Sequence, residues 1–368
     1  LRARHRHDPG LALLHPGGHR QMTDVAILGE LAYWQQTGIR VGAGLAAVLL
    51  VAGTLVYLHL FKLVSFMQSR LGPMEAGPFG SLQLLAEVGK FLQKEDIFPR
   101  KADRFVFAAA PFVVLMSTFL LVVVVPGGPD AWFIDSELGI YLAMAVSSVS
   151  VIGILMAGWG SASKYSLLGG LRATGQLIAY ELPLILAVMG VVIQAETMNM
   201  QGIVQAQADG EIFGWGGIGN PYILTQFVAF IIFMVAMQAE LTQTPFDMPI
   251  AESELVTGYM TEYSGMRFLL FFIGEFATAG VFSAIASVLF LGGWWAPIPG
   301  LEFDDNVWNL LGPIVMVTKV VVLTFIIFWA RFSLPRFRED QLQQLAWKVL
   351  IPLSLANIVV TAVLKIVF

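Results

Sequence analysis

The chain has 368 residues, 57% hydrophobic and 13% charged, with a formal net charge of −5. Soluble proteins carry about twice that charged fraction, so the composition excludes an ordinary soluble domain and indicates an integral membrane protein. Cys is absent and only one of the five His, His59, lies beyond residue 19, so disulfides, iron–sulfur ligation, a haem held by two His and a zinc site are excluded, and the chain has no group to carry electrons.

Residues 1–21 differ in composition from the rest of the chain. They are rich in Arg, His, Pro and Gly and contain no apolar run long enough for a signal peptide. Two interpretations stay open: a disordered N-terminal extension, or an upstream start assigned in error with the native chain beginning near Met22. We expect residues 22–368 to form a single membrane domain.

Eight apolar segments follow, and each supplies close to the ~20 residues that a membrane-spanning helix needs. The predicted spans cover about residues 39–64, 105–125, 138–158, 176–195, 222–241, 268–291, 310–330 and 347–367. The predicted fold is therefore an all-α polytopic membrane protein with eight transmembrane helices, plus one amphipathic helix on the cytoplasmic side.

Basic residues are confined to alternate loops. The first, third, fifth and seventh loops contain twelve Lys or Arg, whereas the second, fourth and sixth contain none. By the positive-inside rule the odd-numbered loops face the cytoplasm and both termini face outward. The basic residues 1–21 would then lie on the outer side, which favours Met22 as the start.

The first loop, residues 68–104, combines a turn region with the predicted amphipathic helix. Gly and Pro in residues 70–78 predict tight turns. Leu85, Val88 and Leu92 then recur at helical spacing, which predicts a helix lying in the membrane interface. Packing of the same apolar face on another subunit is an alternative compatible with that prediction.

The stretch between the fifth and sixth spans, residues 240–265, contains five carboxylates and no Lys or Arg. The carboxylates are Glu240, Asp247, Glu252, Glu254 and Glu262. Acidic residues contribute little to membrane orientation, so this concentration is not explained as a topology signal. Two interpretations stay open: a carboxylate array that passes protons or binds a polar head group, and a solvated acidic surface.

A helical arrangement would bring three of these carboxylates together. Asp247 is placed to cap a helix, with Pro249 in its first turn. If that helix continues, Asp247, Glu254 and Glu262 share one face, whereas Glu252 points away. Three neighbouring carboxylates would repel each other unless some were protonated or paired.

The ionisable residues inside the predicted spans include Glu181, Glu240, Glu275 and Lys319. A charge at the bilayer centre costs about 2.5–3.5 kcal/mol on insertion scales, so each needs a functional or structural reason. Proton transfer is one reason. The other is a buried ion pair, such as one between Glu275 and Lys319, which is a possible counter-ion.

The loop after the seventh span contains a second group of charges. Arg331, Arg336 and Arg338, with Asp340, predict either a docking surface for a soluble partner or simple topogenic charge. The glycines of the chain show no phosphate-binding pattern of strand, glycine loop and helix.

Several uncommon motifs occur in a fixed order along the chain. They are Gly158-Trp-Gly-Ser-Ala-Ser-Lys-Tyr165, Leu171-Arg172, Tyr180-Glu181, Thr244-Pro-Phe-Asp247, Glu252-Ser-Glu-Leu255, Trp329-Ala-Arg331, Leu334-Pro-Arg336, Asp340-Gln341 and Trp347-Lys348. In these motifs the chain resembles the H subunit (the subunit 1 family) of bacterial complex I, the proton-pumping NADH:quinone oxidoreductase. The resemblance extends from Met22 to Phe368.

The resemblance implies a membrane subunit that forms the quinone-access chamber and couples quinone reduction to proton translocation in the bacterial plasma membrane. It implies a proton channel through Glu181, Glu240, Asp247, Glu254 and Glu262, and a quinone chamber formed by Arg70, Phe246, Asp247, Glu252 and Arg267. For Glu275 we expect the structural pair with Lys319. No catalytic residue and no metal ligand are implied.

Quinone, either ubiquinone or menaquinone, would be the substrate, and no covalently bound cofactor is expected. The implied partners are the peripheral-arm subunits of the quinone site, neighbouring membrane subunits, quinone and membrane lipid, but no nucleic acid. The chain departs from the family pattern at Glu75, where relatives often have a basic or neutral residue, at Gln243, often Arg, and at Ile250, often an acid.

Two other functions remain as alternatives. One is the membrane-anchor subunit of a related membrane-bound hydrogenase, which shares the fold and much of the acidic stretch. The other is a stand-alone transporter, against which the large and charged cytoplasmic surface argues.

Overall fold

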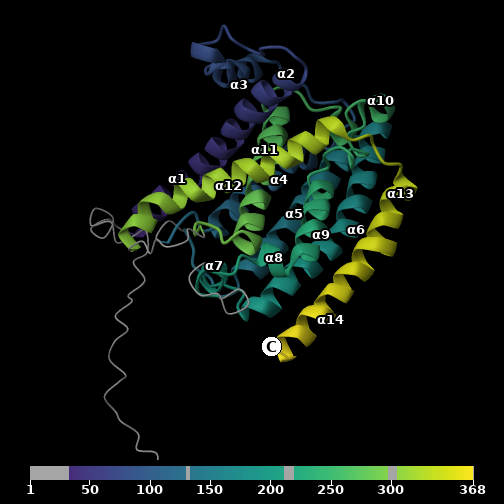
Figure 1. Cartoon of the computed structure of the whole chain (residues 1–368). Helices are drawn as coiled ribbons and strands as arrows, with labels where there is room; N and C mark the ends of the chain where they lie inside the picture. Colours follow the sequence, from purple (N-terminus) through teal and green to yellow (C-terminus); the bar gives the residue numbers. More distant parts are fainter. Residues whose placement is uncertain (1–32, 130–132, 211–218, 297–304, 368) are drawn as a thin grey trace, which may run out of the picture.

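The computed structural model describes residues 33–129, 133–210, 219–296 and 305–367, and every regular element within these ranges is a helix (Figure 1). The extension expected at residues 1–21 lies outside the described residues. In chain order the helices are α1 (Tyr33–Leu55), η2 (Val56–Leu63), α2 (Val64–Met67), η3 (Pro78–Gly80), α3 (Gln83–Gln93), α4 (Arg104–Val124), α5 (Gly139–Gly160), α6 (Lys164–Ala195), α7 (Met200–Asp209), α8 (Tyr222–Thr225), α9 (Phe227–Glu240), α10 (Glu252–Leu255), η4 (Gly258–Met260), α11 (Gly265–Phe290), α12 (Asp305–Ser333), α13 (Glu339–Gln344), η5 (Leu345–Leu350) and α14 (Ile351–Val367).

Seven helical segments in the described ranges are long and apolar enough to cross a membrane. They are Thr37–Met67, Arg104–Val124, Gly139–Gly160, Lys164–Ala195, Gly265–Phe290, Val307–Ser333 and Glu339–Val367. At the remaining predicted span, 222–241, the helix is interrupted at Gln226, so α8 has 4 residues and α9 has 14. The predicted all-α polytopic fold is confirmed.

Exposed aromatic side chains mark two levels along the bundle. Trp159, Trp329 and Trp347 lie at the end that carries the odd-numbered loops, which we call the basic end, and Trp34 and Tyr141 lie at the opposite end. Aromatic residues gather at membrane interfaces. Tyr141 and Trp159 on α5 are 18 positions apart, a rise of about 27 Å, close to the ~30 Å thickness of a bilayer core.

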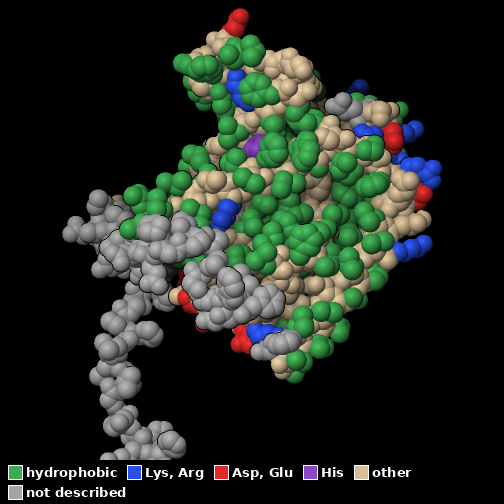
Figure 2. Space-filling model, viewed as in Figure 1, with side chains coloured by type: hydrophobic (Ala, Val, Ile, Leu, Met, Phe, Trp, Pro, Cys, Tyr) green, Lys and Arg blue, Asp and Glu red, His purple; other side chains and the backbone are tan. Residues whose placement is uncertain are grey.

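The outer surface between these levels is apolar. Figure 2 shows hydrophobic side chains over most of the face that α12 and α14 cross, with charged side chains at its margins. Leu310, Ile314, Val317 and Phe325 of α12 are all exposed. Such a surface suits hydrocarbon, so the chain is a multi-pass membrane protein.

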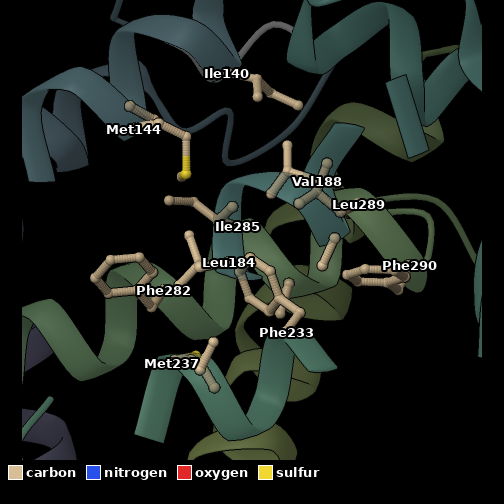
Figure 3. Close-up of a cluster of buried hydrophobic side chains, with 14 of the residues drawn as sticks. Ile140, Met144, Leu184, Val188, Phe233, Met237, Phe282, Ile285, Leu289 and Phe290 are labelled. Atoms are coloured by element: carbon tan, nitrogen blue, oxygen red, sulfur yellow. The ribbon is translucent and has the colours of Figure 1, made fainter. Parts of the chain in front are cut away.

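The core forms where α5, α6, α9 and α11 meet (Figure 3). Leu184, Phe233, Phe282, Ile285 and Phe290 are all at most 2% exposed there. Lipid tails are as apolar as these side chains, so helices in a bilayer are held together mainly by close packing. The core therefore holds the ends of α6, α9 and α11 at the basic end in fixed positions.

The predicted amphipathic helix is α3, which projects from the bundle at the basic end (Figure 1). Phe91 stacks on Phe268 of α11 at 5.7 Å, whereas Leu85 and Leu92 are 67% and 62% exposed. The apolar face of α3 is therefore open for the membrane interface or another subunit, the two environments that the sequence allows.

The helix predicted to start at Asp247 does not form, and this corrects the sequence analysis. The helical part is limited to the single turns of α10 and η4, which are separated at Val256 by a φ of 66°. Gly258 has a φ of +58° and lies so close to Pro249 that a Cβ would be 1.8 Å from the Pro249 carbonyl oxygen. The chain folds back on itself because burial of Phe246, Met248 and neighbouring apolar residues outweighs local helix propensity.

Candidate functional site

Residues 241–264, the acidic loop, are attached to α6 at their N-terminal half. The buried Gln176 Nε2 donates hydrogen bonds to the carbonyl oxygens of Ala239 at 2.7 Å and Phe246 at 2.9 Å. The Phe246 ring packs against Tyr180 and Phe337, with centroids 5.2 and 5.5 Å away. One amide and one aromatic cluster thus fix the chain immediately before Asp247.

The C-terminal half of the acidic loop is attached to α4. The Tyr263 hydroxyl donates to the Phe107 carbonyl oxygen at 3.0 Å, and the two rings stack at 4.1 Å. Burial raises the pKa of Tyr263 above its ordinary value. Burial, with the nearby charges of Glu275 and Asp247, also raises the pKa of Tyr259. Both phenols therefore stay neutral at cellular pH.

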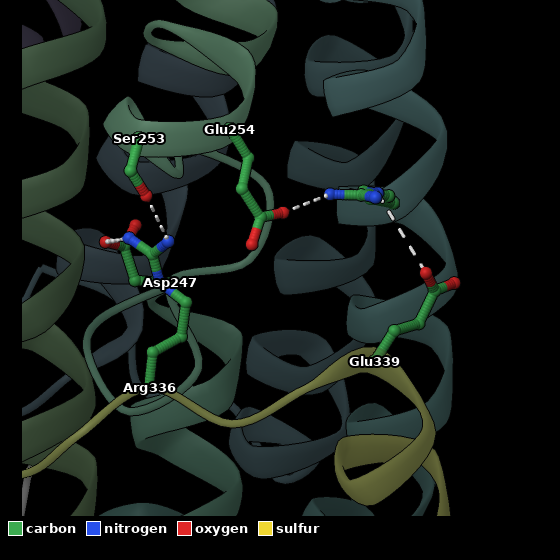
Figure 4. A network of polar contacts seen from close by, with 6 residues as sticks. Asp247, Ser253, Glu254, Arg336 and Glu339 are labelled. Atoms are coloured by element: carbon green, nitrogen blue, oxygen red, sulfur yellow. Dashed lines mark hydrogen bonds and ion pairs between the residues drawn. The ribbon is translucent and has the colours of Figure 1, made fainter.

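Two ion-pair groups join the acidic loop to α6 and to the segment before α13 (Figure 4). Arg336 lies 3.2 Å from the Asp247 carboxylate and also donates to Ser253 Oγ at 3.3 Å. Arg172 lies 3.0 Å from Glu254 and 3.9 Å from Glu339. Asp247 and Glu254 are therefore each neutralised by an arginine from another segment.

These ion pairs border a cleft of about 440 Å³ at the basic end. Its lining combines apolar Met248 and Phe337 with charged side chains, among them the exposed pair of Arg338 and Asp340. Six of its eight lining residues are charged, so the cleft suits a polar or charged group of a partner.

Glu262 does not join this arrangement. Its side chain is half-buried and forms no ion pair or hydrogen bond with other residues in the ranges that the structure describes. The predicted single face of Asp247, Glu254 and Glu262 is wrong, because it depended on a continuous helix. Glu252 lies in α10, and its side chain is not described.

Glu275 of α11 forms a second charged group beside the acidic loop. Gln243 Nε2 donates to Glu275 Oε1 at 2.6 Å, and Arg331 Nη1 lies 3.3 Å from the same oxygen. Arg331 also donates to Gln243 Oε1, which closes the triad. The pairing of Glu275 with Lys319 expected from the sequence is wrong.

Lys319 binds backbone carbonyls at the other end of α11. Its ammonium donates to Leu291 O at 2.6 Å and Gly293 O at 2.8 Å. Because α11 and α12 run antiparallel, Glu275 near the start of α11 lies beside the end of α12. Lys319, in the middle of α12, lies beside the C-terminus of α11, where a cation is favourable.

Glu240 and Glu181 lie beneath the acidic loop. Glu240 ends α9, and its Oε2 is buried with no hydrogen-bond partner in the described part of the chain. Glu181 of α6 accepts a hydrogen bond from Ser148 Oγ. The two carboxylates lie near enough to repel each other.

Two residues expected in the quinone chamber contact or lie in the segments that flank α3. Arg267 lies 2.7 Å from the Asp96 carboxylate and 3.8 Å from the centre of the Phe98 ring, so it binds the chain after α3 to α11. Arg70, in the turn before α3, donates to Gln68 Oε1 at 2.8 Å. Of the predicted chamber residues, the structure brings Phe246 and Asp247 together and gives Arg70 and Arg267 separate contacts.

The sequence analysis did not place several residues that organise this region in the proton channel or the quinone chamber: Gln176, Arg172, Gln243, Glu275, Arg331 and Arg336. A signal was available for the three arginines, because each lies in one of the uncommon motifs. Nothing in the sequence showed which carboxylate each arginine would reach.

Comparison with known proteins gives consistent matches. The family model described as NADH dehydrogenase matches residues 41–362. The NADH-quinone oxidoreductase H subunit of Brevibacillus brevis is 43% identical over 325 residues, 87% of this chain and 92% of that protein. The H subunit numbered 2 in Syntrophobacter fumaroxidans is 45% identical over 327 residues, covering 86% and 92%. The H subunit of Chlorobaculum tepidum is 40% identical over 350 residues, covering 92% and 95%.

Proposed function

This chain belongs to the NADH dehydrogenase family, and from that premise we propose that it is the H subunit of a proton-translocating NADH:quinone oxidoreductase, complex I. The near-complete overlap with relatives that are named as H subunits supports this assignment. The chain contains no Cys and only one His beyond residue 19, so electrons must reach quinone through partner subunits.

The basic end would face the cytoplasm, where the peripheral-arm subunits would dock. The distribution of Lys and Arg supports this orientation. The charged cleft beside Arg336 and Arg338 supports docking at the same end. Neighbouring membrane subunits and lipid would cover the apolar sides of the bundle.

Quinone would reach its reduction site along the basic end of this chain. We assign the chamber to Arg70, Phe246, Asp247, Glu252 and Arg267. Two contacts support that assignment: Asp247 is held at the cleft by Arg336, and Arg267 fixes the chain after α3. Glu75, in the turn before α3, adds a negative charge near the path by which quinone would approach.

The proton route would run from the acidic loop, through Asp247, Glu254 and Glu262, to Glu240 and Glu181. Quinone reduction consumes two protons, so it changes the charge next to the acidic loop. Asp247 and Glu275 are near enough to interact electrostatically, which would pass that change to the triad of Glu275, Gln243 and Arg331. The observation that carries the proposal is the buried Glu240 carboxylate, whose Oε2 has no described partner and which lies beside Glu181.

The substitution Glu240→Gln tests this route in membranes that contain the assembled complex. Gln keeps the size and hydrogen bonding of Glu but removes the titratable proton. We expect normal assembly with loss of most quinone-dependent turnover and of the proton gradient. The matched control is Glu196→Gln at the opposite end, where the Glu196 side chain is 77% exposed, and it should leave both unchanged.

Full turnover and pumping in an assembled Glu240→Gln complex would contradict the proton route. Loss of assembly together with loss of activity would instead assign Glu240 a structural role. The subunits that co-purify with the chain in detergent would identify the electron donor. Components of a hydrogenase among them would assign the chain to the related membrane-bound hydrogenase instead of complex I.

A further inference from the structure

A hydroxyl group on α5 lies against the Glu181 carboxylate of α6, and the proposed proton route makes no use of it. Ser148 Oγ is hydrogen-bonded to Glu181 Oε1, and no other group in the described part of the chain forms a hydrogen bond or ion pair with that carboxylate. The same hydroxyl lies 3.2 Å from the Met144 carbonyl oxygen, one turn earlier on α5. Ser148 therefore lies between a carboxylate and a carbonyl oxygen.

Packing between α5 and α6 holds these groups in place. Met144 of α5 is buried, and so are Tyr180 and Leu184, which flank Glu181 on α6. The Tyr180 hydroxyl also donates to the Leu342 carbonyl oxygen at 2.9 Å. The contact between Ser148 and Glu181 is therefore set by buried neighbours on both helices.

The hydroxyl can serve both protonation states of Glu181, because Ser has one O–H donor and can accept through its lone pairs. When Glu181 is ionised, Ser148 donates to its Oε1. When Glu181 carries a proton, the carboxyl O–H donates to Ser148 Oγ, and Ser148 turns its own hydrogen to the Met144 carbonyl oxygen. Ser147 Oγ also donates to that carbonyl oxygen at 2.7 Å, so it keeps a side-chain partner in both states.

We propose that Ser148 is a positioning residue of the proton route, whose hydroxyl holds Glu181 in one place while that carboxylate gains and loses a proton. A buried polar atom left without a partner is costly, and here the rotation of one hydroxyl separates two fully bonded states. Ser148 keeps its own hydrogen throughout, so it neither consumes nor supplies a proton. The inference rests on the proposed route through Glu181.

One other charge acts on this carboxylate. Glu240 of α9 interacts electrostatically with Glu181, and α5 carries no charged residue. Charged side chains on other elements that pack against α6 either pair with arginine or lie at the surface; toward the basic end they include Glu254, Glu275, Glu339 and Lys348. The pH response of Glu181 should therefore depend on Glu240 and on the hydrogen bond with Ser148.

Removing the hydroxyl tests the proposal in membranes that contain the assembled complex. In Ser148→Ala, ionised Glu181 loses its described donor, and hydrogen bonds to a charged group are the stronger ones. We expect the acid limb of the pH profile of quinone-dependent turnover to move about one unit toward higher pH. Ser148→Thr keeps a hydroxyl at this position and should retain the wild-type profile.

Ser150→Ala is the matched control on the same helix. Ser150 is also partly buried, but its hydroxyl donates to the Ser147 carbonyl oxygen at 2.7 Å, so its removal should leave the profile unchanged. If Ser148→Ala lowers the amount of assembled complex, Ser148→Cys is the second variant. A thiol is close to a hydroxyl in shape but is a weak donor, so this variant should move the profile in the same direction.

The infrared carbonyl band of protonated Glu181 gives a readout that does not depend on turnover. The band is identified in difference spectra between low and high pH by its absence from Glu181→Gln. In Ser148→Ala the band should move to higher frequency, because the carboxyl group loses its hydrogen bond, and it should persist to higher pH.

An unchanged pH profile and an unchanged Glu181 band in assembled Ser148→Ala would overturn the proposal. A Ser148→Thr variant as altered as Ser148→Ala would also overturn it, because the hydroxyl would then not be the group that matters. Either result leaves the proton route intact when Glu181→Gln loses turnover. Full turnover in an assembled Glu181→Gln complex would instead contradict the proton route, and the role of Ser148 would fail with it.

Discussion

Polar side chains occur at two levels along α6 and α9, and the two levels differ in chemistry. At the level nearer the basic end lie Glu181 of α6 and Glu240 of α9, which interact electrostatically. Near the opposite end lie Gln194 of α6 and Gln226, the residue before α9. Between these levels, residues 182–193 of α6 and 227–237 of α9 are entirely apolar or Gly and Pro.

The opposite-end groups form a network of neutral side chains that we call the amide node: Gln194, Gln226, Asn357 and Thr361. Gln226 Nε2 donates to Gln194 Oε1 at 3.0 Å and to Thr361 Oγ1 at 2.9 Å, and its Oε1 accepts from Asn357 Nδ2 at 2.9 Å. The node joins α6 and α14 at the interruption between α8 and α9.

The comparison separates two uses of buried polarity in a membrane. Amides hold helices together without changing their protonation at cellular pH. Carboxylates and arginines respond to any nearby change of charge, because their interactions are long-ranged in a medium of low dielectric constant. Under the proposed function, sensitivity to redox chemistry would belong to the basic end, and the opposite end would serve as a fixed support.

The first prediction tests whether the two ends lie on opposite sides of the membrane, and its outcome is all-or-none. In intact cells, an impermeant thiol reagent should label a cysteine at Glu137 but should label a cysteine at Lys101 only after the membrane is ruptured. Both positions are exposed, and the chain has no native Cys to add background. The reverse pattern would invert the orientation of both ends.

The second prediction concerns the triad of Glu275, Gln243 and Arg331 at the basic end. Arg331→Met leaves the Glu275 carboxylate without its cation. The Glu275 side chain is only 15% exposed. Breaking a buried pair in this way costs about 3–5 kcal/mol. We expect a large loss of stability, measured as a lower unfolding temperature of the solubilised protein.

The same substitution at Arg338, whose side chain is 79% exposed, is the control and should have little effect. Adding Glu275→Gln to Arg331→Met should restore most of the stability. Equal losses in Arg331→Met and Arg338→Met would remove the distinction between buried and exposed charge at this end.

The third prediction concerns the amide node. Gln226→Leu removes three hydrogen bonds between helices. At ~0.6 kcal/mol each in a membrane, the expected loss of stability is about 2 kcal/mol. Turnover per assembled complex should be unchanged, and a changed pH profile of turnover would show that the node takes part in proton transfer.

The smallest effect concerns pH and the exposed pair of Arg338 and Asp340. Hydrogen bonds from Arg338 hold the pKa of Asp340 below its ordinary value. The stabilisation of the folded state by this pair is therefore complete above the pKa of about 3.9 that Asp340 has in the unfolded chain. It is lost as pH falls through the lower pKa that Asp340 has in the folded chain. Unfolding temperatures of wild type and Arg338→Gln should change in parallel from pH 8 to pH 5, and wild type should lose its small advantage only at lower pH.

The sequence analysis located the membrane helices well, because a helix that faces lipid needs a long apolar run whatever its neighbours are. It also located α3, since an interfacial helix has its own apolar periodicity. It failed where the chain leaves the membrane. Asp247 and Pro249 had the local pattern of a helix start, but burial of Phe246 and Met248 against other segments decided the backbone there.

The partners in the ion pairs could not be predicted from the sequence either. Lys319 was a possible counter-ion inside a span, and Glu275 was assigned to it. The antiparallel packing of α11 and α12 brings Arg331 to Glu275 and leaves Lys319 beside the carbonyl oxygens after α11. Likewise, Arg172 and Arg336 reach Glu254 and Asp247 across 82 and 89 residues of sequence.

The sequence by itself determined the family, the membrane-spanning fold and the end at which charge concentrates, because hydropathy, motif order and the placement of Lys and Arg are local properties. Only the tertiary structure decided which carboxylates are neutralised by arginine and which, like Glu240, lie buried beside another acid. Those pairings depend on distances of a few ångströms between helices far apart in the chain, and the electrostatic energy of a pair depends directly on that distance.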